Sequence, residues 1–258
     1  MKLEFVKYQG TGNDFIIIDN RNKRFDKANV DLIQHLCDRK FGIGSDGLIL
    51  IENHKEWDFD MLFFNPDGSQ SFCGNGSRCA VAFAKELELI SDFAKFNSTD
   101  GYHEASINNL GEVKLKMHDV NDIEINELYH YMDTGSPHYN CFKNNIDTIN
   151  IVEKGKEIRY NERFKDVGTN VNFIEQLSKG IKVRTYERGV ENETLSCGTG
   201  VTACALSTAL VNEIQKGEIK VNTKGGDLSV SFSQTENGFE DIWLIGPTMF
   251  VFKGEIEV

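Results

Sequence analysis

Short apolar runs separated by Gly, Asn and Asp recur along the whole chain, and this pattern is typical of β-strands with turns between them. The predicted strands of the first half are 4–8, 15–19, 48–52, 59–64 and 113–117. Those of the second half are 181–187, 218–223, 228–232 and 241–245, with a last strand at 250–258 that we expect to return to the first half. The chain is therefore rich in strands in both halves.

Helical periodicity is limited to a few segments. Residues 31–39 place Leu32, Ile33 and Leu36 on one face, with Asp31 near the start, and residues 149–156 form a weaker candidate. Two further helices are expected directly after Cys73 and Cys197. Both are poor in charged residues and show no clear polar face, so we expect them to be buried.

Strands, a buried helix and more strands occur in this order twice, which indicates an internal duplication. The predicted fold is α+β, with two pseudo-symmetric domains, each a curled, barrel-like sheet around a central buried helix. The predicted boundary lies at 119–121. An N-terminal domain at 1–120, joined by the C-terminal strand 249–258, would precede a C-terminal domain at 121–248.

The net charge, the apolar runs and the cysteine spacing limit the kinds of partner and cellular location that we expect for this protein. The 258 residues carry a net charge of −12 with a pI of about 5.0, which argues against nucleic acid or an anionic membrane. Apolar runs are too short to span a bilayer, and the N-terminus lacks the apolar region of a signal peptide. The six cysteines show no CxxC pair and no metal-ligand spacing. We therefore expect a cytoplasmic protein without a bound metal.

The string Cys-Gly-x-Gly occurs twice, beginning at Cys73 and at Cys197, each time at the expected start of a buried helix. A lone cysteine is more often a packing residue than a reactive one. Here the glycines at the second and fourth positions would let the backbone approach a ligand and expose N–H groups. A helix N-terminus also favours a thiolate. We predict two acid/base thiols, and assign Cys37, Cys79, Cys141 and Cys204 to packing.

Other motifs are weaker when taken alone. Glu187 and Arg188 could hold an ammonium and a carboxylate, or could form an ordinary surface ion pair. If both lie on one strand, their side chains point to opposite faces. The Gly-rich loops at 10–15 and 42–47 lack the continuation of a phosphate-binding loop. His138 lies in a turn, where a lone histidine is usually structural or exposed.

Taken in order, the segments resemble the diaminopimelate epimerase family over essentially the whole chain. The matching segments are 12–15, 41–47, 65–69, 73–79, 137–138, 170–173, 187–189 and 197–200. The two cysteine segments are the most specific. The resemblance implies a pseudo-symmetric pair of domains with the active site in the cleft between them. It also implies epimerisation of LL-2,6-diaminopimelate to the meso isomer, in lysine and cell-wall precursor biosynthesis.

Three departures from the family pattern affect the loops. One residue fewer than usual lies between the Asp-Gly-Ser turn and Cys73, and the loop before Cys197 is one residue longer. Ser136 stands where the family commonly has a substrate-binding Asn, and its shorter hydroxyl would need a bridging water. These changes concern loop geometry and leave the chemistry intact.

The resemblance assigns roles to individual residues. Cys73 and Cys197 are the two bases, and His138 tunes the thiol pair. Glu187 holds the reacting ammonium, while Asn13, Asn65, Asn170 and Arg188 hold the distal end of the substrate. Backbone N–H groups of Gly74, Asn75, Gly198 and Thr199 would bind the reacting carboxylate. No pyridoxal phosphate or other cofactor is implied, because no Schiff-base lysine is recognisable.

Two alternatives stay open at this stage. Proline racemase and hydroxyproline epimerase share the two-thiol architecture but act on a cyclic amine. A non-catalytic module that binds an anionic ligand would leave both thiols inert. The expected partner is a small amino-acid substrate, and a homodimer is left open.

Overall fold

The computed structural model describes residues 2–258, which divide into two compact units. The first unit comprises the residues up to Leu115 together with Gly246–Val258, and the second comprises Lys116–Ile245. The predicted boundary at 119–121 lies a few residues after this division. No helix among residues 2–258 is long and apolar enough to cross a membrane.

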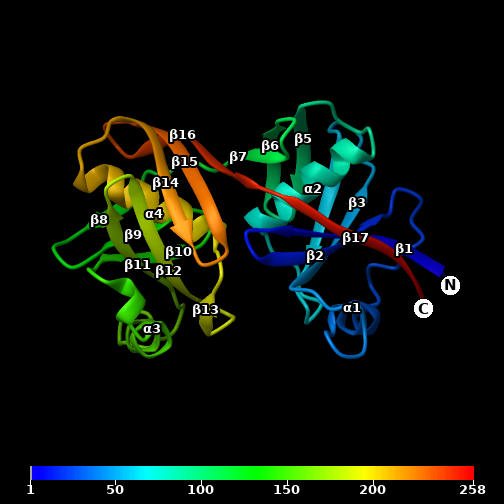
Figure 1. Cartoon of the computed structure of the whole chain (residues 1–258), viewed down its shortest axis with the longest axis horizontal. Coiled ribbons are helices and arrows are strands. Elements are labelled where there is room, and N and C mark those ends of the chain that lie inside the picture. Colours follow the sequence, from blue (N-terminus) through cyan, green and yellow to red (C-terminus); the bar gives the residue numbers. More distant parts are fainter. Residues whose placement is uncertain (1) are drawn as a thin grey trace. The chain divides into compact units, whose positions relative to one another are not determined.

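The first unit is a curled sheet around one helix (Figure 1). Its strands are β1 (Lys2–Gly10), β2 (Asn13–Asp19), β3 (Gly47–Glu52), β4 (Phe59–Phe64), β5 (Phe93–Ser98), β6 (Gly101–Ile107), β7 (Glu112–Lys116) and β17 (Met249–Glu257). Helix α2 (Gly74–Glu86) contacts β1, β2, β3, β4 and β6, so the sheet wraps around it. Strand β17 pairs with β1 in antiparallel fashion.

The second unit repeats this plan. Its strands are β8 (Ile123–Ile125), β9 (His130–Asp133), β10 (Pro137–Phe142), β11 (Asn170–Leu177), β12 (Gly180–Glu187), β13 (Asn192–Thr194), β14 (Lys216–Thr223), β15 (Gly226–Gln234) and β16 (Phe239–Pro247). Helix α4 (Gly198–Val211) packs on β9, β10, β11, β12, β14 and β15. Its buried positions lie all around the helix, as its apolar sequence predicts.

Strand pairing demonstrates the duplication directly. From β1 to β6 the successive pairs are antiparallel, parallel, antiparallel, parallel and antiparallel. From β9 through β10, β11, β12 and β14 to β15 the same order recurs. Helix α2 lies in the chain between β4 and β5, and α4 lies between the equivalent strands β12 and β14. The α+β class, with a central buried helix in each unit, is confirmed.

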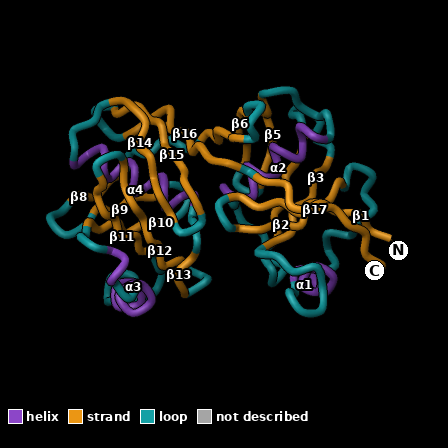
Figure 2. Tube along the Cα trace, viewed as in Figure 1, coloured by secondary structure: helices purple, strands orange, loops and turns teal. Residues whose placement is uncertain are grey.

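The two remaining helices lie outside the sheets and connect equivalent strands (Figure 2). Helix α1 (Val30–Cys37) joins β2 to β3, and α3 (Ile151–Arg159), after the short 3₁₀ helix η1 (Ile146–Thr148), joins β10 to β11. Each begins after an Asn N-cap: Asn29 accepts from the Leu32 N–H and Asn150 from the Glu153 N–H. The helix predicted at 149–156 thus starts and ends later than expected.

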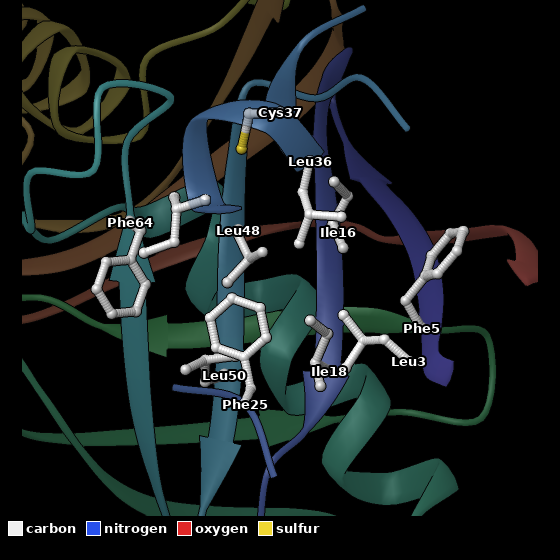
Figure 3. Close-up of a cluster of buried hydrophobic side chains, with 11 residues drawn as sticks. Leu3, Phe5, Ile16, Ile18, Phe25, Leu36, Cys37, Leu48, Leu50 and Phe64 are labelled. Atoms are coloured by element: carbon white, nitrogen blue, oxygen red, sulfur yellow. The ribbon is translucent and has the colours of Figure 1, made fainter. Parts of the chain in front are cut away.

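A cluster of buried apolar side chains packs α1 on the outer face of β1, β2 and β3 (Figure 3). Its members include Phe5, Ile16, Leu36, Leu48 and Leu50. Burying one such side chain contributes about 1.5–3 kcal/mol. The cluster therefore anchors β2, whose first residue is the predicted site residue Asn13.

We expect Leu48→Ala to lower the free energy of unfolding by about 2–5 kcal/mol, because the fully buried side chain would leave a cavity. The matched control is Leu110→Ala, since Leu110 is 92% exposed and should change stability by less than about 0.5 kcal/mol. Urea denaturation of both variants measures the difference. Equal losses would contradict the packing described for β3.

Candidate active site

Cys73 is the N-cap residue of α2. Its Sγ accepts the Gly76 N–H at 3.4 Å, and the residue is half-buried. N–H groups in the first turn have no partner within the helix, and the positive end of the dipole lies there. This setting lowers the free energy of a thiolate relative to a thiol.

Asn13 and Asn75 lie beside the Cys73 sulfur. The Oδ1 of Asn13 accepts from Asn75 Nδ2 at 3.2 Å and lies 3.8 Å from Cys73 Sγ. Asn13 Nδ2 donates to Asp46 Oδ2 at 2.8 Å, which fixes the orientation of the amide. The structure therefore brings three of the predicted site residues together, and adds Asp46, to which the sequence analysis assigned no role.

Asn65 follows β4 and holds the loop that leads to Cys73. Its Nδ2 donates to the carbonyl and hydroxyl of Ser69, at 3.2 and 3.1 Å, and to Ser71 Oγ at 3.1 Å. In this structure the amide shapes the shortened loop.

Cys197 is the N-cap residue of α4 and is also half-buried. Its Sγ lies 3.4 Å from Thr199 Oγ1, and Thr199 Oγ1 lies 2.9 Å from His138 Nε2. Ser136 Oγ approaches both His138 Nε2, at 3.0 Å, and Thr199 Oγ1, at 3.2 Å. A chain of hydroxyl and imidazole groups thus leads to the sulfur, and Ser136 enters it directly.

Asn172 determines which nitrogen of His138 carries the proton. Its Oδ1 accepts from Thr185 Oγ1 at 2.8 Å, and its Nδ2 donates to Asn140 Oδ1 at 2.8 Å. The same Nδ2 lies 3.0 Å from His138 Nδ1, which must accept. A neutral His138 therefore carries its hydrogen on Nε2, facing the hydroxyls of Ser136 and Thr199.

His138 is fully buried on β10. Burial, with a smaller contribution from the positive charge of Arg188, lowers the pKa of His138 to about 3. The imidazole is neutral near pH 7, so it acts there as a hydrogen-bond donor and not as a cation.

Glu187 and Arg188 lie at the end of β12 and just after it. Thr194 Oγ1 donates to Glu187 Oε2 at 2.7 Å. Arg188 lies in the turn, where its N–H donates to Asn170 Oδ1 at 2.9 Å and its Nη1 to the Val167 carbonyl at 3.2 Å. Strand β12 ends at Glu187, as expected, so Arg188 does not share a strand with Glu187 and the alternation of side chains along one strand does not apply to this pair.

Asn170 connects this turn to the segment before His138. Its Nδ2 donates to Ser136 Oγ and to the Pro137 carbonyl, both at 3.1 Å. The predicted residues Cys197, Thr199, His138 and Asn170 thus form one hydrogen-bonded group in the second unit.

The fourth-position glycines serve a purpose that we did not expect. A Cβ on Gly200 would lie 2.9 Å from Asn172 Oδ1 and 3.2 Å from His138 Cε1. A Cβ on Gly76 would lie 3.2 Å from Ile49 Cδ1. A side chain at either position would therefore crowd residues of the same unit, most closely at Gly200.

Residues that the sequence analysis missed are mainly buried polar ones. Asn140, Asn172 and Thr185 support His138, and the first two occupy paired positions on the parallel strands β10 and β11. The available signal was the alternation of His138 with Asn140 and of Asn170 with Asn172.

The low pKa of His138 gives a testable pH dependence. Unfolding restores a pKa near 6.5, so between about pH 3 and 6.5 the unfolded chain binds one more proton. The contribution of His138 to stability is fully present above about pH 6.5 and is lost as the pH falls, by up to about 1.4 kcal/mol per pH unit.

We expect His138→Gln to flatten the dependence of the unfolding free energy on pH between pH 4.5 and 7. Urea denaturation across this range measures the slope. Ser136→Ala is the control, since it removes a neighbour of the imidazole but no titrating group. An unchanged slope in His138→Gln would contradict the buried neutral imidazole.

Comparison with known proteins identifies relatives over nearly the full length. The diaminopimelate epimerase family model matches residues 5–122 and 130–250. A diaminopimelate epimerase of Flavobacterium psychrophilum is 48% identical, with 98% of this chain and 100% of the relative covered. One of Aquifex aeolicus is 38% identical, with 98% of each covered.

Solved structures share the fold at low identity. A PhzF-family phenazine biosynthesis protein of Bacillus anthracis superposes with a TM-score of 0.78 at 15% identity, covering 100% of both chains. A hydroxyproline epimerase of Agrobacterium vitis, with bound trans-4-hydroxy-L-proline, gives 0.70 at 14% identity, covering 99% of this chain and 91% of that one. These likenesses concern the fold alone. The family model and the full-length relatives show that this chain belongs to the diaminopimelate epimerase family.

Proposed function

We propose that this protein interconverts LL- and meso-diaminopimelate by cofactor-independent proton transfer at one α-carbon, with Cys73 and Cys197 as the acid/base pair. Membership in the diaminopimelate epimerase family supports the substrate. The single observation that carries the mechanism is that each unit presents a half-buried cysteine as the N-cap of its central buried helix. A cytoplasmic location is part of the proposal, in keeping with the absence of CxxC spacing among the six cysteines.

Epimerisation requires that a proton leave one face of the α-carbon and that another be added to the opposite face, and two thiols can perform these two steps. One base cannot easily reach both faces of a fixed Cα, whereas two groups can act from opposite faces. One cysteine, as thiolate, removes the Cα proton and becomes a thiol. The other, as thiol, donates its proton to the opposite face and becomes a thiolate. The reverse reaction exchanges the two roles, and no net proton is gained or lost.

The helix N-termini would stabilise the intermediate. Removing the Cα proton shifts negative charge onto the substrate carboxylate. We assign that carboxylate to the backbone N–H groups of Gly74, Asn75, Gly198 and Thr199, which belong to the first turns of α2 and α4. Donors held there in advance interact more strongly with the growing charge than with the ground state.

His138 would act on Cys197 through Thr199. The neutral imidazole donates from Nε2, so the Thr199 hydroxyl can direct its own hydrogen towards Cys197 Sγ, 3.4 Å away. A hydrogen bond to the sulfur favours its thiolate form. His138 is therefore a positioning group and not the proton carrier.

Recognition of the rest of the substrate is assigned to polar groups of both units. Glu187 would hold the reacting ammonium. Asn13, Asn65, Asn170 and Arg188 would hold the distal amino-acid end, for which Arg188 supplies a guanidinium suited to a carboxylate. Buried polar contacts of this kind reject analogues that lack the distal groups.

We expect Cys73→Ala and Cys197→Ala each to lower epimerisation by at least about 100-fold, because each removes one proton-transfer group. Incubation with LL-diaminopimelate in D₂O, followed by NMR at Cα, measures the exchange. Cys141→Ala is the control and should keep the rate, since that thiol is buried and its pKa is raised to about 12 by burial. Near-normal formation of the meso isomer by either alanine variant would exclude the two-base mechanism, and no exchange by the wild type would favour a non-catalytic binding module.

We expect Arg188→Lys to lower kcat/KM for diaminopimelate by about 10–100-fold although the charge is kept, because an ammonium cannot replace a bidentate guanidinium. Steady-state kinetics measure the loss. Proline should be a very poor substrate of the wild type, since it lacks the distal carboxylate. Racemisation of proline as fast as epimerisation of diaminopimelate would favour the proline racemase alternative.

A further inference from the structure

The guanidinium of Arg78 is buried inside the first unit with little compensation. Arg78 lies on α2, five residues after the N-cap Cys73, and its side chain is fully buried. Its Nη2 donates to Thr11 Oγ1 at 3.3 Å, while Nε and Nη1 have no hydrogen-bond partner among the described residues. Burial lowers the pKa of Arg78, against a smaller opposite effect of the Cys79 and Cys73 thiols. A buried guanidinium without a neutralising partner lowers the free energy of unfolding, which indicates that Arg78 has a role other than packing.

The second unit shows that the fold does not require an arginine at this position. Thr202 lies five residues after Cys197 on the equivalent helix and is also fully buried. Its hydroxyl donates to the Gly198 carbonyl of its own helix at 3.0 Å. At the position of α4 that is equivalent to Arg78, a small side chain that bonds to its own helix is therefore sufficient for the fold.

Arg78 holds a strained turn. Strands β1 and β2 are joined through Thr11 and Gly12, with Gly10 paired to Asn13. Thr11 has φ +50° and Gly12 has φ +82°, as in the tightest hairpin turns. A β-branched residue rarely adopts a positive φ, and such backbone persists only where its surroundings enforce it. The hydrogen bond from Arg78 to the buried Thr11 hydroxyl is such a restraint.

The turn leads directly to the group around Cys73. A Cβ on Gly10 would lie 3.3 Å from the Asn75 carbonyl and 3.4 Å from Arg78 Nη2, so the hairpin lies against α2. Asn13, which follows the turn, contacts both Asn75 and Cys73. A shift of Thr11 would therefore move the Asn13 amide relative to the Cys73 sulfur.

From this geometry we propose that Arg78 is a positioning residue, which holds the Thr11–Gly12 turn and thereby places Asn13 at the Cys73 N-cap. The inference rests on the proposed role of Cys73 as an acid/base group. It explains why an unneutralised guanidinium occupies a position where the other unit has Thr202.

The matched pair Thr11→Val and Thr11→Ser tests the restraint. Both change the same buried side chain, but Val keeps the shape and loses the hydroxyl, whereas Ser keeps the hydroxyl. We expect Thr11→Val to lower kcat/KM for diaminopimelate about 10-fold and Thr11→Ser to lower it by less than about threefold. Equal losses in the two variants would overturn the proposal.

Arg78→Met separates positioning from folding. Replacing a buried unpaired charge by an apolar side chain should leave the urea midpoint at or above that of the wild type, while kcat/KM falls at least about 10-fold. Combining it with Thr11→Val should cause no further loss, because both changes remove the same interaction. Losses that multiply would overturn the proposal, and should Arg78→Met fail to fold, the Thr11 pair decides alone.

Thiol alkylation tests the placement of Asn13 beside Cys73 without requiring that the protein turn over a substrate. Iodoacetamide labelling of the substrate-free protein, resolved by peptide mass spectrometry, gives the rate at Cys73 relative to Cys197. Thr11→Val and Arg78→Met should change this ratio at least about threefold and in the same direction, and Thr11→Ser should not. A wild-type ratio in Thr11→Val overturns the positioning role, whereas absence of epimerisation by the wild type overturns only the proposed function.

Discussion

The structure depends on one constraint: a cysteine must cap a helix that is buried on all sides within a curled sheet. Strands surround such a helix along most of its length, and the capping cysteine at its start is half-buried. The capping thiol shares the electrostatic environment of the N–H groups in the first turn. In each unit the strands, the glycine at the fourth motif position and the loops leading to the cysteine follow from this placement.

Duplication supplied two such helices, and the polar residues around them have diverged. In the first unit the sulfur lies beside amides, Asn13 and Asn75, with Asp46 and Arg78 behind them. In the second unit it lies beside a hydroxyl that is oriented by a buried neutral imidazole. Two thiols in equivalent positions of the duplicated fold therefore have different neighbours.

Both units also place costly polar groups in their interiors. His138, Asn140, Asn170 and Asn172 occupy paired inward positions on β10 and β11, where apolar residues would pack at lower cost. In the first unit the buried polar group that costs stability is the guanidinium of Arg78. His138 contacts Thr199, which lies beside Cys197, and Arg78 contacts the turn before Asn13, which lies beside Cys73, so stability is exchanged for the geometry around each sulfur.

Local sequence patterns by themselves determined the fold class, the duplication, both N-cap cysteines and most of the apolar strands, because each of these follows from residues close together in the chain. Strands β5, β6, β8, β9, β10, β11 and β13 were not predicted; in β10 and β11 the inward positions are polar and read as loop, whereas β12 ends at Glu187 as expected. The tautomer of His138 and the restraint of Thr11 by Arg78 were decided only by the tertiary structure. The reason is physical: these interactions join residues 34 and 67 positions apart, and no local pattern records which distant partner satisfies a buried polar group.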